Sequence, residues 1–386
     1  MKFAFHIASA EWLGRPSGLQ QFNRRRRFLA AHAALTRKAI EVVTRSILTA
    51  LALATLFAPA AYAQSLSLKV LGQPAGSGLI AQNKEKPFFE ALGTNAGMDV
   101  SVQYLPVDVA GIPDSDGLRV LKSGLFDIVS IRGPQVSRDE PSILGLDLIG
   151  LNTSYEAGRP HIEAFYDTVD GRLQSQFNAK LLGVWPAGPQ IIFCKPEIGG
   201  LADLKGLKVR VGDQSAANFM AGLGATGVPM PFGEVQQSLA RGVVDCAVTG
   251  PASANSGGWP EATTTVLPLA LQMAVNGYAI NLNKWNAMSG EDQSKLQAAI
   301  TALSDDIWTY SEELYADAMR CNSGQTPCAL ATSYALKQAP VSDEDVATVA
   351  SAVADVSLPV WAQQCNAVFA ECETKWRETV GVQLGL

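Results

Sequence analysis

The residue best suited to bind a charged ligand lies at the end of one predicted strand. The segment Leu204-Lys205-Gly206-Leu207-Lys208-Val209-Arg210-Val211 alternates apolar residues and places Arg210 before a polar loop. A guanidinium can hold a carboxylate through two parallel charge-assisted hydrogen bonds. Spacing alone favours a commoner explanation, an exposed arginine in a surface salt bridge. The segment is therefore a candidate anion site that needs support from its surroundings.

Catalytic sites find little support in this sequence. Of the three histidines, two precede residue 64, and only His161 remains in the rest of the chain. His161 follows Gly158-Arg159-Pro160 in an expected polar helix start, where we expect it at the surface. A single histidine excludes most histidine-based triads and histidine-rich zinc sites, and the sequence has no G-x-S-x-G elbow. The residues indicate a binding protein rather than an enzyme, with no metal site or cofactor.

The first 63 residues have the pattern of an export signal. Ser46 to Phe57 form a short apolar run, basic residues precede it, and Ala61-Tyr62-Ala63 follows it. A basic flank, an apolar segment of about 7–15 residues and an A-x-A end are typical of secretory signals. The run is too short to span a bilayer, which takes roughly 20 residues. We expect cleavage after Ala63 and a mature periplasmic chain that does not itself span the membrane.

The stretch before this apolar run is longer than a signal needs. It contains Arg24-Arg25-Arg26-Arg27-Phe28-Leu29, and twin arginines before Phe-Leu resemble a Tat address. The apolar run begins well downstream of them, however. A start codon placed too early is an equally good explanation of the extra length.

Residues 64–386 are strongly acidic. The leader contains nine Lys and Arg but only two Asp and Glu, which leaves a net charge of about −13 for the remainder. This balance argues against nucleic acid or an anionic membrane as a partner. An acidic protein that binds an acid must concentrate positive charge locally, so its individual arginines are informative.

Residues 64–177 are expected to form an N-terminal α/β lobe. Alternating or continuous apolar runs predict strands, separated by helical patterns. This β-α-β-α-β series implies a mainly parallel sheet with helices on both faces, and ligands bind beyond the carboxyl ends of such strands. The expected strands are 66–71, 98–104 and 126–131, and the expected helices are 83–92 and 116–122.

A second α/β lobe is expected over residues 178–275. Its helix over 232–239 leads to Arg241-Gly242, a helix-end and turn pair. Its expected strands are 180–185, 190–194, 207–211 and 243–248.

Residues 276–386 are expected to form a crossover strand and helices that pack across both lobes. The strand is predicted over 275–282. Ser289-Gly290-Glu291-Asp292 is a capping-box start, followed by one apolar stripe from Leu296 to Met319. Ser342 opens another helix, and a final helix is predicted from Leu358 to Val380.

Five motifs along the chain resemble one receptor family. They are Leu121 to Asp127, Leu204 to Arg210, Gly227 to Val235, Leu239 to Asp245 and Leu282 to Ser289. In this order and spacing they resemble the DctP-type receptors of TRAP (tripartite ATP-independent periplasmic) transporters. Each motif alone is loose, but five in order are specific, and the resemblance covers essentially all of residues 64–386.

The resemblance implies a two-lobed receptor that closes on a small organic acid and passes it to a membrane permease. Arg210 occupies the position from which family members bind the ligand carboxylate. Phe232 falls where the family packs a ring against the ligand. Asp213 and Thr249 fall in two loops that the family uses for polar contacts. No metal or redox cofactor is implied, and we expect a monomer.

This chain departs from the family's pattern at some of these positions. Many members have a second arginine where this chain has Gln190. Arg132 could supply the missing positive charge from the opposite lobe, or it could pair with Asp139 or Glu140 as a structural bridge. Two tryptophans, Trp185 and Trp259, could line the pocket, although packing in a lobe core is the commoner role of a tryptophan.

Six cysteines in an exported chain permit disulfides. Cys365 and Cys372 are expected on one helix, about 10 Å apart along its axis, whereas a disulfide needs Cα atoms within roughly 7 Å. We therefore expect these two not to bond each other. Cys321 and Cys328 could bond each other or cross to that helix, and the crossed pairs are favoured slightly. Cys194 and Cys246 are either a buried pair or small hydrophobic residues.

The function expected from the sequence is capture of a small carboxylate for a TRAP permease. A receptor that delivers its ligand to a membrane sensor is the alternative, and a periplasmic hydrolase or isomerase is the enzyme alternative.

Overall fold

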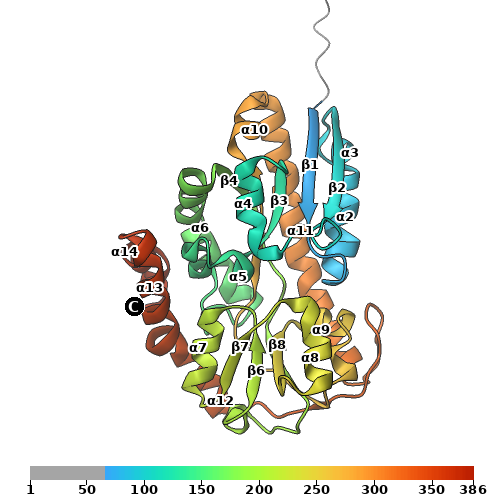
Figure 1. The fold of residues 1–386 in the computed structure, drawn as a ribbon, viewed down its shortest axis with the longest axis vertical. Helices are drawn as coiled ribbons and strands as arrows, with labels where there is room; N and C mark the ends of the chain where they lie inside the picture. The colour runs from blue at the N-terminus through green and yellow to red at the C-terminus, as the bar shows by residue number, and fades with distance from the viewer. Residues whose placement is uncertain (1–65) are drawn as a thin grey trace, which may run out of the picture. The chain divides into compact units, whose positions relative to one another are not determined.

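The computed structural model describes residues 66–386, so the predicted export signal and its cleavage site lie outside the described residues. Within this range the strands form two separate sheets (Figure 1). Each sheet with the helices packed on it is called a lobe below. The expected α/β class is confirmed, and both sheets combine parallel with antiparallel pairs.

The first lobe is built on a five-stranded sheet. Strand β1 pairs in parallel with β2 and β3, whereas β10 enters from much later in the chain and runs antiparallel to β3 and β4. β10 is buried along its whole length because it lies between two neighbours. In spatial order the strands are β2 (Val100–Pro106), β1 (Leu66–Gly72), β3 (Ile128–Arg132), β10 (Val275–Asn281) and β4 (Ala179–Pro186).

Helices cover the faces of this first sheet. A continuous aliphatic and aromatic core joins them to the strands, with Phe89, Phe165, Trp185 and Tyr278 among its fully buried rings. The helical segments are η1 (Ala81–Glu85), α2 (Lys86–Glu90), α3 (Leu92–Ala96), η2 (Asp114–Asp116), α4 (Gly117–Ser123), α5 (Gly133–Val136), η3 (Pro141–Leu146), α6 (Tyr155–Phe177) and α10 (Leu282–Ala287).

The second lobe is built on a six-stranded sheet. Its two faces carry separate apolar cores. In spatial order the strands are β11 (Lys337–Gln338), β9 (Thr265–Leu267), β5 (Ile191–Cys194), β8 (Cys246–Thr249), β6 (Lys208–Val211) and β7 (Thr226–Pro229). The helical segments are η4 (Leu201–Leu204), α7 (Gln214–Gly222), η5 (Phe232–Glu234), α8 (Val235–Arg241), α9 (Pro251–Ser256) and η6 (Trp259–Glu261).

The chain passes between the lobes several times. Two extended segments join the sheets, one from β4 to β5 and the other from β9 to β10. The long helix α11 (Gly290–Asn322) contacts β4 in the first lobe and α9 in the second (Figure 1). The lobes are therefore connected by two extended segments and a helix.

The C-terminal helices also bridge both cores. Residues 343–368 are long and apolar enough to cross a membrane by length and composition alone. They instead pack on protein, because Val349 and Ala352 join a core of the second lobe while Leu358 and Trp361 join that of the first. The segments are α12 (Asp343–Ala352), η7 (Val353–Ser357), α13 (Leu358–Val368), α14 (Cys372–Trp376), η8 (Arg377–Gly381) and α15 (Val382–Leu384).

The prediction of one final helix from Leu358 to Val380 is wrong. Helix α13 ends at Val368 because Phe369 is extended, with φ −149° and ψ 94°. The Phe369 ring packs under the guanidinium of Arg172, 5.1 Å from its centroid. The chain then turns back, and the amide side chain of Asn366 accepts a hydrogen bond from the backbone N–H of Glu373 at 3.0 Å.

This break reverses the predicted disulfide pairing. Cys365 bonds Cys372 across the turn, with Cα atoms 5.8 Å apart, because the two residues do not share one continuous helix. Cys321 bonds Cys328, so the favoured crossed pairing is wrong. Cys194 bonds Cys246, which resolves the open alternative in favour of a buried pair.

The surface position predicted for His161 is also wrong. Helix α6 begins at Tyr155, where Ser154 caps its N-terminus, so His161 lies in its second turn. There it is 9% exposed, and its Nδ1 lies 3.1 Å from Oδ1 of Asn152. Burial lowers the pKa of the imidazole.

The predicted helix boundaries that depend on capping are confirmed. Ser289 accepts a hydrogen bond from the backbone N–H of Asp292 and begins α11. Ser342 and Asp345 form a complete capping box at α12. Gly242 ends α8 in the left-handed conformation, with φ 70°, which favours glycine because it lacks a Cβ.

Candidate ligand-binding site

Arg210 lies inside the second lobe rather than at its surface. Strand β6 is flanked by β7 and β8, and Arg210 is only 3% exposed. Its Nε and Nη2 donate to the backbone carbonyl of Met230 at 3.0 and 2.7 Å, and its Nη1 donates to that of Val248 at 3.0 Å. The neighbouring strand ends therefore fix the orientation of the guanidinium.

Arg210 has no carboxylate within hydrogen-bonding or salt-bridge distance in residues 66–386, although the nearby buried Asp213 acts to raise its pKa. Its hydrogen bonds go to two neutral carbonyls. One N–H on each terminal nitrogen has no acceptor in the part of the chain that the structure describes, because a guanidinium has five donors. Burial, and then the charge of Arg132, lower the pKa of Arg210. An anion would relieve both effects, since a buried charge is stabilised by an opposite one.

A small hollow of about 60 Å³ lies against Arg210 and between the lobes. Strand ends and loops of both sheets meet around it. Its lining includes Arg132, Gln135 and Asn276 from the first lobe, Arg210, Phe232, Thr249 and Ser253 from the second, and Gln190, Gln272 and Ala274 from the connecting segments. We call it the inner hollow.

Two aromatic rings support the Arg210 side of the inner hollow. Phe232 is partly buried at the start of η5 and faces the hollow. Its ring stacks on Trp259 with centroids 5.2 Å apart, and the guanidinium of Arg210 lies 5.7 Å from the centroid of Trp259. Trp259 is fully buried and lines neither the inner hollow nor the outer one described below. It therefore positions Phe232 and Arg210 from behind.

Gln190 and Thr249 are brought to the inner hollow by two paired strands. β5 and β8 run antiparallel, and Ile191 pairs with Thr249. The amide nitrogen of Gln190 donates to the carbonyl of Gly188 at 2.7 Å, which fixes its side chain. The Cys194–Cys246 disulfide joins the same two strands at Cα atoms 4.0 Å apart.

Asp213 follows β6 but has a different role from a lining residue. Its carboxylate is the N-cap of α7 and accepts from the backbone N–H of Ala216 at 2.9 Å. The residue is 6% exposed and lines neither hollow. Burial raises the pKa of this carboxyl, while Arg210 acts in the opposite direction.

Arg132 reaches the hollow from the end of β3. Its guanidinium lies 5.9 Å from the ring centroid of Phe232, across the cleft. It also forms a salt bridge with Asp114 at 2.7 Å. The structural partners predicted for Arg132 are wrong, because Asp139 pairs with Arg119 and Glu140 with Arg172.

A wider hollow of about 430 Å³ continues outward from the inner one. Arg132, Gln135 and Phe232 line both, so they form the partition between them. Asp108 and Asp114 add two carboxylates to this outer hollow. The lobes also touch here, since Gln135 donates to the carbonyl of Gly212 at 3.4 Å and Ser253 to that of Ser77 at 3.3 Å.

Several polar residues of the two hollows were not predicted from the sequence. Gln135, Gln272 and Asn276 line the inner hollow, but uncharged amides in loops and strands have no distinctive spacing. Asp114 was missed because its partner lies 18 positions along the chain. Trp185 lines a separate hollow of about 30 Å³ beside Arg132 and Asn276.

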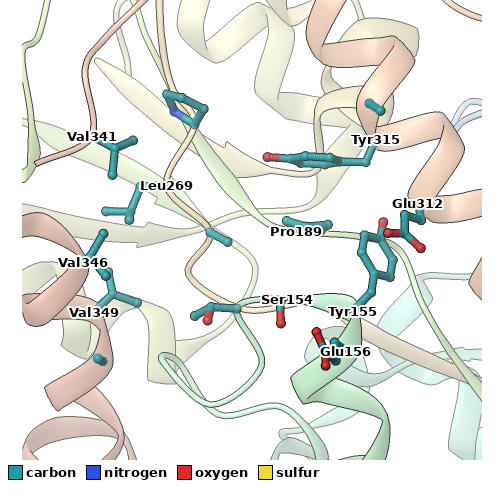
Figure 2. A pocket seen from close by; sticks show the side chains of 15 residues that line it. Ser154, Tyr155, Glu156, Pro189, Leu269, Glu312, Tyr315, Val341, Val346 and Val349 are labelled. Carbon is teal, nitrogen blue, oxygen red and sulfur yellow. The ribbon is translucent and has the colours of Figure 1, made fainter. Parts of the chain in front are cut away.

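A larger hollow, of about 650 Å³, is less suited to an acid. Figure 2 shows the aliphatic side chains of Leu269, Val341, Val346 and Val349 on one side of it, and Tyr155, Tyr315 and two glutamates on the other. Its charged lining residues are Glu156 and Glu312, and no Lys or Arg lines it. An anionic ligand would meet only like charge there.

The sequence of this chain is similar to those of known solute-binding proteins. The family model for bacterial extracellular solute-binding protein, family 7 (DctP), matches residues 86–322, more than half of the chain. A solute-binding protein of Roseobacter denitrificans is 26% identical over 259 residues, which cover 64% of this chain and 77% of that protein.

Solved structures share the fold at low sequence identity. A TRAP periplasmic solute binding protein of Desulfovibrio salexigens with bound orotic acid has a TM-score of 0.70 and 14% identity, covering 81% of this chain and 97% of that one. The Bordetella pertussis receptor DctP7, which binds pyroglutamic acid, has a TM-score of 0.67 and 17% identity, with 81% and 99% covered. A marine metagenome TRAP solute binding protein specific for aromatic acid ligands has a TM-score of 0.68 and 21% identity, with 82% and 98% covered. The expected two-lobed fold is confirmed.

Proposed function

Because this chain belongs to family 7 of the bacterial extracellular solute-binding proteins, we propose that it captures a small organic acid between its lobes. The ligand carboxylate binds Arg210 in the inner hollow. The receptor then delivers the acid to a TRAP-type membrane permease. The N-terminal 63 residues direct the chain to the periplasm, where such a receptor would act.

The observation that carries this proposal is the incomplete pairing of Arg210. The chain buries a guanidinium, fixes it with two carbonyls and provides no carboxylate to it among residues 66–386. Burying an unpaired charge is costly, so a purely structural arginine would be expected to have an acidic partner. A carboxylate from a ligand would occupy the two remaining N–H donors and neutralise the charge.

The ligands of structures with the same fold support this class of ligand. Relatives of similar fold have been solved with pyroglutamic acid, orotic acid and β-D-glucuronate. Each of these is a carboxylic acid or its anion, although the three carbon skeletons differ. The shared carboxylate agrees with an arginine as the fixed contact, and the variable remainder agrees with a lining that differs from one receptor to another.

Calorimetry of Arg210→Ala tests this function. A thermal-shift screen of organic acids first identifies a ligand, since a ligand of the native state raises its apparent stability. Arg210→Ala should then lose about 2–5 kcal/mol of binding free energy, the usual effect of truncating one partner of a buried charge pair. Arg241→Ala is the matched control, because Arg241 is exposed at the end of α8, away from the cleft.

Two results would contradict the proposal. One is binding by Arg210→Ala within twofold of the unmodified protein. The other is a screen in which neutral or cationic solutes stabilise the protein and carboxylates do not.

A further inference from the structure

We propose that the cleft selects monocarboxylates with an uncharged polar remainder and discriminates against dicarboxylates, with Asp114 as the residue that sets this preference. This inference rests on the proposed function, since it assumes that one carboxylate of the ligand binds Arg210. It concerns the other end of the ligand.

The two arginines of the cleft differ in their pairing. Arg210 has no acidic partner in residues 66–386, whereas Nη1 of Arg132 lies 2.7 Å from Oδ2 of Asp114. The side chains of this pair are 20% and 22% exposed, so water screens it less than a pair at the open surface. Of these two arginines, only Arg210 thus offers a ligand a guanidinium that forms no direct salt bridge with a carboxylate of residues 66–386. A second carboxylate could use Arg132 only by displacing Asp114.

The outer hollow disfavours a second carboxylate for another reason. Its charged lining residues are Asp108, Asp114 and Arg132, which give it a net negative charge. Asp108 is held in place because its Oδ1 accepts from the backbone N–H groups of Ala75 and Val109 at 2.9 and 3.0 Å. Like charges repel strongly where water is partly excluded. A ligand group that extends into this hollow is therefore expected to carry no negative charge.

The inner hollow is too small to contain a whole ligand. Its volume of about 60 Å³ is a small fraction of the roughly 300–1,000 Å³ of a typical ligand pocket, so most of a ligand would lie outside it. The remainder must pass Arg132 and Phe232 toward the outer hollow. Uncharged amides lie along the first part of this path, at Gln135, Gln190, Gln272 and Asn276. Amides donate and accept hydrogen bonds, which suits hydroxyl, carbonyl or amide groups on the ligand.

Matched pairs of acids test this preference. Each dicarboxylate is compared by calorimetry with its half-amide, which has the same skeleton and one charge fewer: succinate with succinamate, glutarate with glutaramate, and phthalate with phthalamate. We expect the half-amides to bind at least about tenfold more tightly, the effect of one unfavourable charge contact. Asp114→Asn should raise the affinity for the dicarboxylates by about tenfold and change that for the half-amides little, because it releases the charge of Arg132.

Asp116→Asn is the matched control. It removes the same charge from the same short helix η2, but Asp116 pairs with Arg119 and lines neither hollow. The inference is overturned if the unmodified protein binds the dicarboxylates as tightly as their half-amides. It is also overturned if Asp114→Asn and Asp116→Asn have equal effects.

Arg210→Ala separates this inference from the proposed function. If the half-amides still bind Arg210→Ala unchanged, the proposed function fails. If Arg210→Ala abolishes binding while the unmodified protein prefers dicarboxylates, the proposed function stands and only the role of Asp114 is wrong.

Discussion

Glu85 in the first lobe and Arg210 in the second are both almost completely buried, and neither has an oppositely charged partner in the described chain. Oε1 of Glu85 accepts from the backbone N–H of Gln73 at 2.7 Å and from the hydroxyl of Tyr104 at 2.8 Å. Oε2 accepts from the hydroxyls of Ser130 at 2.7 Å and Tyr278 at 3.1 Å. The lobe supplies four donors to one carboxylate.

The second lobe satisfies the hydrogen-bond donors of Arg210 only in part. Two carbonyls accept three of its hydrogen bonds, and two of its five donors remain without a protein acceptor in the described range. The Glu85 carboxylate lines none of the cleft hollows, whereas Arg210 lines the inner one. The comparison teaches that burial alone does not mark a binding group. A buried ion saturated by the chain maintains the structure, and an unsaturated one beside a hollow is available to a ligand.

The largest expected effect on stability comes from removing the saturated ion. Glu85→Ala should lower the free energy of unfolding by roughly 3–5 kcal/mol, because it leaves several buried donors without an acceptor. Glu85→Gln retains an acceptor oxygen and should cost less. Urea denaturation measures both. If Glu85→Ala were as stable as the unmodified protein, the contrast between the two ions would be wrong.

A third buried ionisable group, the carboxyl of Asp147, contacts the segment that joins β9 of the second lobe to β10 of the first. Both oxygens of Asp147 accept from the backbone N–H of Met273 at 3.1 Å, and Oδ1 accepts from Asn152 at 2.9 Å. Burial raises the pKa of Asp147 to about 7. The folded protein therefore holds this proton to higher pH than the unfolded chain does, and stability falls as pH rises from about 4 to about 7.

Asp147→Asn should remove this part of the pH dependence. The difference in unfolding free energy between the two proteins should change by about 4 kcal/mol across the window and become constant above it. Urea denaturation of both proteins between pH 4 and 8 measures this difference. Subtracting one profile from the other isolates the contribution of Asp147, because other carboxyl groups that titrate in this range contribute equally to both. Parallel pH profiles for the two proteins would show that Asp147 ionises normally.

Removal of the Cys194–Cys246 disulfide is expected to lower the free energy of unfolding by a similar amount. Cys194 and Cys246 are separated by 52 positions, whereas Cys321 and Cys328 are separated by seven. Loop-closure entropy predicts a loss of about 4 kcal/mol for the Cys194→Ala/Cys246→Ala double variant and about 2 kcal/mol for Cys321→Ala/Cys328→Ala. Thermal unfolding compares them. A smaller loss for the first pair would mean that the paired strands β5 and β8 retain their order without the bond.

The smallest expected effect on stability comes from removing the unsaturated ion. Arg210→Met should change the free energy of unfolding by about 1 kcal/mol or less, because losing a costly unpaired charge offsets the loss of its hydrogen bonds. The same variant should bind the acid ligand poorly. A loss as large as that of Glu85→Ala would indicate that Arg210 is mainly structural.

Local sequence signals predicted much of the fold. Apolar runs placed the central strands of both sheets, and serine caps located the starts of α11 and α12. The strand predicted over 180–185 was assigned to the wrong lobe, because β4 pairs with β10 in the first sheet. The motifs around Arg210 led to the resemblance with DctP-type receptors, which the family model confirms. These signals succeed because they depend on residues close together in the chain. Five of the seven proposed site residues line the inner hollow, and Asp213 and Trp259 lie behind it.

Features that depend on distant segments were missed or predicted wrongly. The break at Phe369 depends on packing against Arg172 in another helix, so spacing alone suggested one helix and the wrong cysteine pairs. The partner of Arg132 is Asp114, at the start of the short helix η2 between β2 and α4. The burial of Glu85 was not predicted, because a glutamate in a helical pattern is ordinarily exposed.

The sequence alone identified Arg210 as the candidate anion contact, because a strand that ends in arginine before a polar loop, among motifs in a fixed order, is a property of the chain itself. It could not determine whether the arginine is exposed, paired or available. Only the tertiary structure decided that, because the pairing of a buried charge depends on which carboxylates and carbonyls of distant segments come within hydrogen-bonding distance. Arg210 meets two carbonyls, Arg132 meets Asp114, and this difference distinguishes the two arginines.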